Sequence, residues 1–108
     1  PDLDIAVVPS GYDPRFFSPR PDAEPRERDL LVFVGSMSYG PNVDAMEHFV
    51  RDVLPRVRQR RPRVRLEIVG LDPAPEVRAL EGPGVRVVGG VPDVRPWFER
   101  ASAVVVPL

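Results

Sequence analysis

The sequence predicts an α/β fold: a parallel-sheet, Rossmann-like half-domain in which strands and helices alternate in the order β-α-β-α-β-α-β. Four apolar runs of strand length alternate with three segments of helical character. Glycine and proline separate these segments at short intervals, so each connection is brief. Because short helical crossovers between successive strands are right-handed, we expect the four strands to be parallel.

The first 29 residues are predicted to form an interdomain strand and a linker. Residues 5–8 (IAVV) are a short apolar run that a PSG turn sequence closes. Residues 12–29 are rich in proline and in alternating charge, which is typical of a linker. Phe16 and Phe17 are the exceptions, and we expect them to pack against the domain that residues 30–108 begin.

The regular part of the chain begins with the apolar run Leu30–Val34, which Gly35 ends and which predicts a strand covered on both faces. A helix of about four turns follows, with Asn42 as its N-cap. Pro55 lies inside this helix and should kink or re-initiate it, because proline lacks an N–H donor, and Pro62 ends it. The apolar stripe of the helix consists of Val43, Met46, Val50, Val53, Leu54 and Val57.

The second half of the chain continues the alternation with shorter elements. Glycines close the next two strands, and Asp93 is expected to cap the last helix. The predicted elements are, in order, a strand at 64–69, a short helix at 77–80, a strand at 85–88, a helix from Asp93 to Ala101 and a strand at 103–106.

Both ends of the sequence suggest a piece of a longer protein. The first residue is Pro rather than Met, and the last six residues (AVVVPL) are an apolar, strand-like run with nothing after them. A strand buried on both faces needs a covering helix and usually a neighbouring strand. We therefore expect the half-domain to be truncated at both ends.

Composition excludes several classes of function. Fifteen arginines and no lysine face sixteen acidic residues, and the net charge of −1 argues against nucleic-acid binding, which needs a basic surface. The chain has no cysteine and one histidine, so it lacks a disulfide framework, a thiol nucleophile and a multi-histidine metal site. No apolar run approaches the roughly 20 residues of a membrane-spanning helix.

The carboxyl ends of the predicted strands are the place where a ligand is expected. Three of the four strands end in glycine, at Gly35, Gly70 and Gly89. Glycine lets a ligand approach the backbone, but it also serves the tight turns of any α/β protein, and both explanations remain open. Neither G-x-G-x-x-G nor G-x-x-x-x-G-K-[ST] occurs, which weakens an NAD-binding or P-loop interpretation.

Other conspicuous residues favour structural roles. His48 points away from the apolar stripe of its helix and should face solvent, where Asp44 lies one turn back. The six arginines within residues 56–65 gather at a helix end, as expected for a solvated face near the negative end of the helix dipole. Trp97 and Phe98 are expected to pack the last helix on the sheet. No Ser-His-Asp or Cys-His arrangement is available for covalent catalysis.

Several stretches together resemble the GT-B glycosyltransferases over nearly the whole length. VVPSGYDPRFFSP (7–19) resembles their interdomain segment, and VFVGSMSYGPNVDAMEHF (32–49) resembles the start of their C-terminal, donor-binding domain. LEIVG (66–70) and VRVVGGVPDVRPWFERASAVVVPL (85–108) continue the likeness. The loop GSMSYGPN is most similar to bacterial sugar transferases of exopolysaccharide synthesis. By this resemblance, residues 30–108 are the N-terminal part of the donor-binding domain.

The resemblance implies retaining transfer of a sugar from a nucleotide-diphosphate sugar, with no metal or other cofactor. By position it places the first strand end against the donor phosphates, the backbone of residues 89–91 against the base, and Asp93 near the polar edge of that base. Many relatives carry Arg and Lys where this chain has Ser36 and Asn42, so charge-assisted bonds of about 1.5–3 kcal/mol each are lacking. The candidate donor-binding residues are Gly35, Ser36, Asn42, Gly89, Val91 and Asp93.

The resemblance also implies parts that these 108 residues do not contain. Relatives carry a Gly-rich loop and a Glu-containing helix after the fourth strand, and an N-terminal domain that binds a glycan or lipid-linked acceptor. We therefore assign no catalytic residue here and expect the chain alone to be inactive and to bind a donor weakly or not at all. A cytoplasmic location is implied, with the inner face of the membrane as an option. Two alternatives stay open: a sugar-nucleotide epimerase of the same fold, and a non-catalytic flavodoxin-like or receiver-like module.

Overall fold

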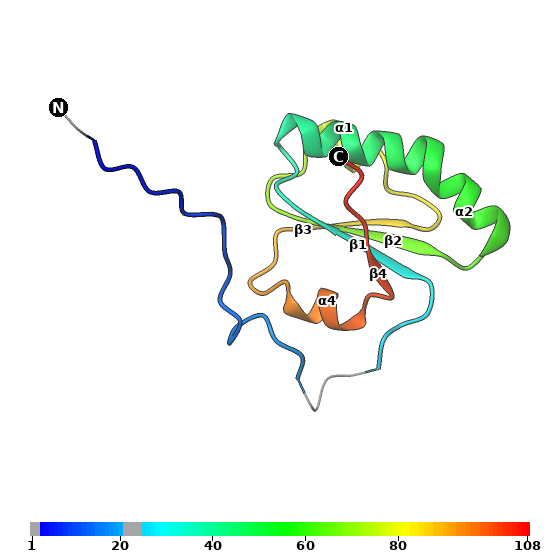
Figure 1. The fold of residues 1–108 in the computed structure, drawn as a ribbon. Helices are drawn as coiled ribbons and strands as arrows, with labels where there is room; N and C mark the ends of the chain where they lie inside the picture. The colour runs from blue at the N-terminus through cyan, green and yellow to red at the C-terminus, as the bar shows by residue number, and fades with distance from the viewer. Residues whose placement is uncertain (1–2, 21–24) are drawn as a thin grey trace.

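The four apolar runs form one sheet in a computed structural model that describes residues 3–20 and 25–108. All strand pairs are parallel, and the strand order is β3-β2-β1-β4 (Figure 1). The strands are β1 (Leu30–Val34), β2 (Arg65–Val69), β3 (Val85–Gly89) and β4 (Ala103–Val104). The predicted α/β, Rossmann-like arrangement with a parallel sheet is confirmed.

Helices cover both faces of this sheet, because alternate residues of each strand point to opposite sides. Leu31 and Phe33 of β1 belong to the apolar core beneath α1 and α2, whereas Leu30 and Val32 belong to the core beneath α4. Figure 1 shows α1 and α2 on one face and α4 on the other. The helices are α1 (Gly40–His48), α2 (Leu54–Arg60), α3 (Pro75–Arg78) and α4 (Arg95–Arg100), with a π-helical turn, η1 (Phe49–Val53), between α1 and α2.

The π-helical turn is the local response to Pro55. An ordinary α-helical residue at this position would donate its N–H to the carbonyl of Arg51, but proline has no N–H and its ring would clash with that carbonyl. The chain widens instead, and the N–H of Leu54 donates to the carbonyl of Phe49, five residues back. The prediction that Pro55 re-initiates the helix is confirmed, since α2 begins at Leu54 with this proline in its first turn.

The predicted start of the first helix is wrong. Tyr39, not Asn42, is the N-cap, and α1 begins at Gly40 with Pro41 in its first turn, where no N–H donor is needed. The side chain of Asn42 points back toward the sheet edge and donates through Nδ2 to the carbonyl of Ser36 at 3.0 Å. Asn42 therefore holds the loop that precedes α1 rather than capping the helix.

The predicted cap of the last helix is displaced by one residue. Val94 is the N-cap of α4, and the helix ends at Arg100 rather than Ala101. Asp93 nevertheless accepts a capping bond, because its Oδ1 lies 3.0 Å from the backbone nitrogen of Arg95. Asp93 accepts from the N–H two residues ahead, in an Asx-turn, and for this reason an aspartate that predicts a cap lies one residue before the true N-cap.

The fourth strand is shorter than the predicted range 103–106. β4 contains two residues and pairs with β1 alone among the described strands, and Val104 is half exposed. One further backbone bond, from the N–H of Val105 to the carbonyl of Val32 at 2.9 Å, continues the ladder. β4 has a neighbouring strand at one edge only among the described strands, and the apolar residues after Val104 do not extend it.

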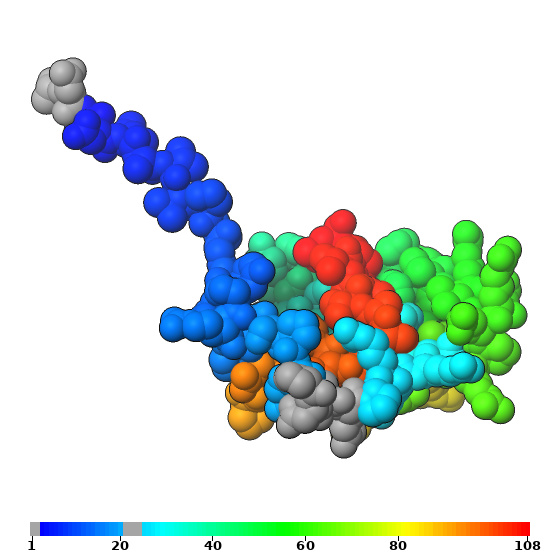
Figure 2. Space-filling view, turned by 60° about the horizontal axis from the view of Figure 1, so that its bottom comes forward, coloured from blue at the N-terminus to red at the C-terminus, as the bar shows by residue number. Residues whose placement is uncertain are grey.

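The segment before the sheet has two different parts. Residues 5–8 form no strand here, and the side chains of Ile5, Val7 and Val8 are 84–88% exposed. Figure 2 shows these residues projecting from the body of the molecule. Phe16 and Phe17 instead contact α4, through Arg95 and Phe98 respectively, which confirms the predicted packing of the two phenylalanines. The assignment of residues 1–29 to an interdomain strand and linker stays a prediction. The predicted linker also includes residues 21–24, which fall outside the described part of the chain.

Residues 26–29 are bound to the sheet domain through charged side chains. Arg26 donates to the carbonyl of Ala101 at 2.8 Å, Glu27 pairs with Arg65, and Asp29 pairs with Arg61 at 2.9 Å. Two of the arginines predicted to lie on a solvated face therefore anchor the entering chain instead. The division between linker and domain at residues 29 and 30 stays a prediction, but these contacts extend the attached region back to Arg26.

Candidate functional site

A hollow of about 280 Å³ lies where β1, β2 and β3 end side by side. This is the carboxyl edge of a parallel sheet, the place where open α/β sheets bind their ligands. Among the described residues, the side chains that line it are apolar except for one hydroxyl, and none of them is charged. The lining residues are Val34, Gly35, Ser36, Val69, Gly70, Leu71, Gly90, Val91 and Val94.

Glycine is required at one point of this edge for packing. A Cβ added at Gly70 would lie 1.6 Å from the carbonyl oxygen of Gly35, so the ends of β1 and β2 could not approach as they do. That approach is held by a backbone bond from the Gly35 N–H to the Val69 carbonyl at 3.0 Å, and a second bond, from the Gly70 N–H to the Gly89 carbonyl at 2.8 Å, holds the end of β2 to β3. Of the two explanations that the sequence left open, strand packing accounts for Gly70.

The loop after β1 is fixed by the loop after β2. The N–H of Met37 donates to the carbonyl of Leu71, and the N–H of Ala74 donates to the carbonyl of Met37, each at 3.0 Å. Met37 is buried, and Asn42 binds the carbonyl of Ser36 from the other side. These bonds restrain the loops that carry Ser36 and Leu71, both of which line the hollow.

The helix that follows this loop offers few free donors to an anion. Pro41 has no N–H, and the amide groups of Asn42 and Val43 both donate to the carbonyl of Tyr39 at 3.0 Å. The first strand end, which the resemblance places against the donor phosphates, therefore gains little from this helix start, because helix N-termini bind anions mainly through their unpaired N–H groups.

Asp93, expected near the base of a donor, is bound by the protein itself. Both carboxylate oxygens accept from the guanidinium of Arg95, at 2.9–3.1 Å. These side-chain bonds, together with the backbone bond from Arg95, lower the pKa of Asp93 below its usual range and raise the pKa of Arg95. The carboxylate is ionised and already paired, so its first role is to hold the loop before α4.

The structure brings together three of the six predicted donor-binding residues. Gly35, Ser36 and Val91 line the hollow. The other three lie next to it: Asn42 supports Ser36, Asp93 holds Arg95, and Gly89 adopts a positive φ of 85° at the end of β3, while Gly90 lines the hollow in its place.

Of the apolar side chains that line the hollow, sequence reasoning predicted Val91 and missed the others. Leu71 is 66% exposed beside the hollow, and a Cβ on Gly90 would lie 2.5 Å from its Cδ2 atom. An exposed leucine directly after a strand-ending glycine was the available signal. Val94 could not be found in this way, because the helix that positions it was predicted to begin one residue too early.

A buried acid on the α4 face was also missed. Glu67 of β2 is 6% exposed and accepts a bond from Nε1 of Trp97 at 2.9 Å, while Arg100 lies 3.5 Å away. This confirms that Trp97 packs α4 on the sheet. Phe98 instead faces the incoming chain, with its ring 6.4 Å from that of Phe17.

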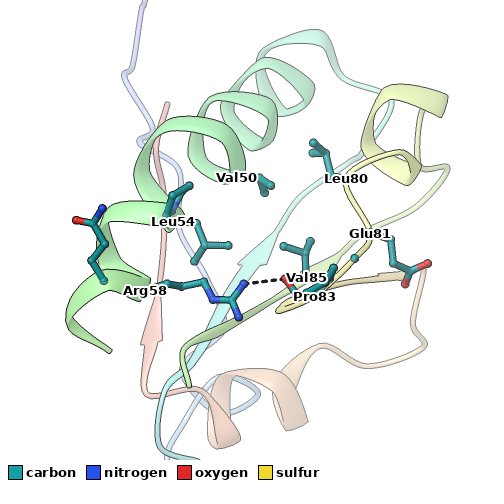
Figure 3. Close-up of a pocket in the computed structure, with 10 residues that line it drawn as sticks. Val50, Leu54, Arg58, Leu80, Glu81, Pro83 and Val85 are labelled. Carbon is teal, nitrogen blue, oxygen red and sulfur yellow. Dashed lines mark hydrogen bonds between the residues drawn. The ribbon is translucent and has the colours of Figure 1, made fainter. Parts of the chain in front are cut away.

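A larger hollow, of about 550 Å³, lies on the other face of the sheet between α2 and the turn before β3. Figure 3 shows Val50, Leu54 and Leu80 around it, with Arg58 reaching across. The guanidinium of Arg58 donates to the carbonyl of Pro83 at 3.0 Å, and the floor is the apolar core itself. This hollow lies near the amino end of β3, away from the edge where ligands of such sheets bind.

Other chemistry is not supported in the described part of the chain. His48 faces solvent as predicted, but it lies 3.1 Å from Asp52, one turn ahead, and not beside Asp44. Within residues 3–20 and 25–108, no three His, Asp or Glu side chains gather closely enough to hold a metal ion. No helix in the same ranges has the length and apolarity that crossing a membrane requires.

The geometry defines a class of protein: an open, parallel Rossmann-like domain with a small hollow at the carboxyl edge of its sheet. Residues 28–108 match the family described as Glycosyl transferases group 1, of GT-B type, and the chain belongs to this family. Neither a curated protein nor a solved structure matches the chain. Glycosyl transfer is thus the family's function, which favours this interpretation over a flavodoxin-like or receiver-like module.

Proposed function

We propose that residues 30–108 are the first part of the donor-binding domain of a retaining glycosyltransferase that uses a nucleotide-diphosphate sugar. The observation that supports this most directly is the hollow at the carboxyl edge, to which Gly35, Ser36 and Val91 all contribute in a chain of this family. The proposed reaction moves the sugar from the nucleotide to an acceptor held by another domain.

The size of the hollow supports a partial site. Small-molecule sites usually measure about 300–1,000 Å³, whereas this hollow has about 280 Å³. It can take a base or a ribose, but not a whole nucleotide sugar. We therefore propose that the 108-residue chain is inactive alone and binds a donor weakly.

The chemistry of the lining supports the uncharged end of the donor as its occupant. Val34, Val91 and Val94 offer apolar surface, and the hydroxyl of Ser36 offers one polar contact. The lining holds no cation to neutralise a diphosphate, so the groups that bind it are proposed to lie outside these residues.

The acceptor and the location remain part of the proposal. The likeness of loop 35–42 to sugar transferases of exopolysaccharide synthesis supports a bacterial enzyme with a glycan or lipid-linked acceptor. Such an enzyme acts in the cytoplasm, and a lipid-linked acceptor would bring it to the inner face of the membrane. Product analysis on a longer form of the protein separates transfer from the epimerase alternative, because only transfer consumes an acceptor.

The test is a titration of the labelled chain with uridine and guanosine diphosphates, followed by amide chemical shifts. We expect shifts at Gly35, Ser36 and Val91, with a dissociation constant of about 1 mM or weaker, and no turnover of nucleotide sugars. Ser36→Phe places a ring in the hollow and should remove these shifts. Ser38→Phe is the matched control, because Ser38 is exposed on the same loop but does not line the hollow.

Two results would contradict the proposal. Shifts confined to Val50, Leu54 and Leu80 would place the ligand in the larger hollow on the other face. Detectable turnover by the isolated chain would show that the catalytic apparatus is already present within these residues.

A further inference from the structure

Arg95 joins the loop before α4 to the chain segment around Phe16, two parts of the molecule that are far apart in the sequence. Its guanidinium binds both carboxylate oxygens of Asp93, with Nε 3.0 Å from Oδ1 and Nη2 2.9 Å from Oδ2. Its backbone N–H donates to the same Oδ1 atom. The side chain therefore folds back over the loop that leads into α4, in a two-point geometry that only the planar guanidinium supplies.

The same guanidinium is covered by an aromatic ring from the linker. Its central carbon lies 3.8 Å from the centroid of the Phe16 ring, and Nη1 lies 3.5 Å from the Phe16 carbonyl oxygen. Phe17 packs edge-on against Phe16 at 4.8 Å and faces Phe98 of α4 at 6.4 Å. A cation held between a carboxylate and a ring face is restrained from both sides.

The loop held in this way contributes directly to the hollow. Asp93 lies between Val91 and Val94, and both valines line the hollow. Neither valine is fully buried, and their packing partners are on the α4 face of the sheet. The loop that carries both side chains is thus restrained by the bonds between Asp93 and Arg95 as well as by this packing.

We propose that Arg95 is a positioning residue for the hollow: through Asp93 it sets the loop of Val91 and Val94, and through Phe16 it ties this loop to the chain segment 13–19. The consequence for ligand binding rests on the proposed function, whereas the coupling itself does not. A displacement of segment 13–19 moves the ring off Arg95 and loosens the wall of the hollow. The hollow then responds to the linker without any contact between the linker and a ligand.

The experiment measures amide hydrogen exchange in the ligand-free chain. Arg95→Ala should speed exchange at the amides of Trp97 and Phe98, which donate to the carbonyl of Val94, about five- to tenfold, while Val32 in β1 stays unchanged. Arg95→Lys keeps the positive charge but cannot bind both carboxylate oxygens as the planar guanidinium does, and it should accelerate exchange by an intermediate factor. Phe16→Leu should act like Arg95→Ala, whereas Phe16→Tyr keeps the ring face and should behave like the parent chain.

Two outcomes would overturn the coupling. Exchange at Trp97 and Phe98 that stays within about twofold of the parent in Arg95→Ala would show that the loop does not depend on this side chain. An equal acceleration at Val32 would show general destabilisation and no local positioning. Exchange in Phe16→Tyr as fast as in Phe16→Leu would show that the aromatic ring of residue 16 has no part in the coupling.

A second measurement separates this inference from the proposed function. Uridine diphosphate is titrated into the parent chain, Arg95→Ala and Phe16→Tyr. A roughly tenfold weaker affinity in Arg95→Ala, with parent affinity in Phe16→Tyr, supports both proposals. Absence of binding to the parent chain would contradict the proposed function, whereas the exchange rates would still decide the coupling.

Discussion

Replacing Gly70 by alanine tests whether this glycine serves the packing of the strand ends. The new Cβ would lie 1.6 Å from the carbonyl oxygen of Gly35, whereas real Cβ atoms essentially never approach closer than 3.0 Å. The ends of β1 and β2 must separate, which stretches the bond from the Gly35 N–H to the Val69 carbonyl. Overpacking of about 1–3 kcal/mol and about 1 kcal/mol of weakened hydrogen bonding give an expected loss of about 2–4 kcal/mol.

Urea unfolding followed by Trp97 fluorescence measures this loss. The midpoint should fall by roughly 1–3 M with an unchanged slope. Gly82→Ala is the matched control, since a Cβ there meets nothing within 4 Å, and it should cost nothing. A folded Gly70→Ala protein within about 0.5 kcal/mol of the parent would refute the reasoning and favour ligand approach as the reason for the glycine.

Three further predictions concern polar contacts. Glu67→Leu should cost about 1–3 kcal/mol in urea unfolding by leaving the indole N–H of Trp97 unpaired, and Glu67→Gln, which keeps an acceptor, should cost less. Arg95 lowers the pKa of Asp93, so the parent should have a higher thermal midpoint than Asp93→Asn at every pH above the usual pKa range of Asp. This difference should vanish as the pH falls through the lowered pKa of Asp93. A difference that persists at the lowest pH would contradict the prediction. Asn42→Ala should lower the free energy of unfolding by about 1 kcal/mol, and Asn42→Asp should lower it further, because a carboxylate would face the carbonyl that Asn42 binds. The reverse order of the two variants in urea unfolding would refute this role.

The strands could be predicted closely because their signal is local. Leu30–Val34 was exact, and the predicted ranges 64–69 and 85–88 differ from β2 and β3 by one residue each. The break at Pro55 was also predictable, since a missing N–H has the same consequence in any helix. Range 103–106 was overestimated, because the length of an edge strand depends on neighbours that a run of valines does not reveal.

The candidate site could be predicted only in outline. Strand-ending glycines indicated the edge, and Gly35 and Ser36 do line the hollow. The roles of Asn42 and Asp93 could not be foreseen, because their partners are chosen by the distance between side chains in space. The cap signal at Asp93 was real, but Arg95 takes both of its carboxylate oxygens.

By itself the sequence determined the alternation of strands and helices, the parallel sheet and the edge at which a ligand is expected, because each follows from local periodicity and from the handedness of crossovers. Only the tertiary structure decided that Gly70 serves packing, that Phe16 covers Arg95 and that the hollow is small and without cations. These features arise where residues distant in the chain meet, and such meetings are set by the packing of the whole domain and not by any one segment.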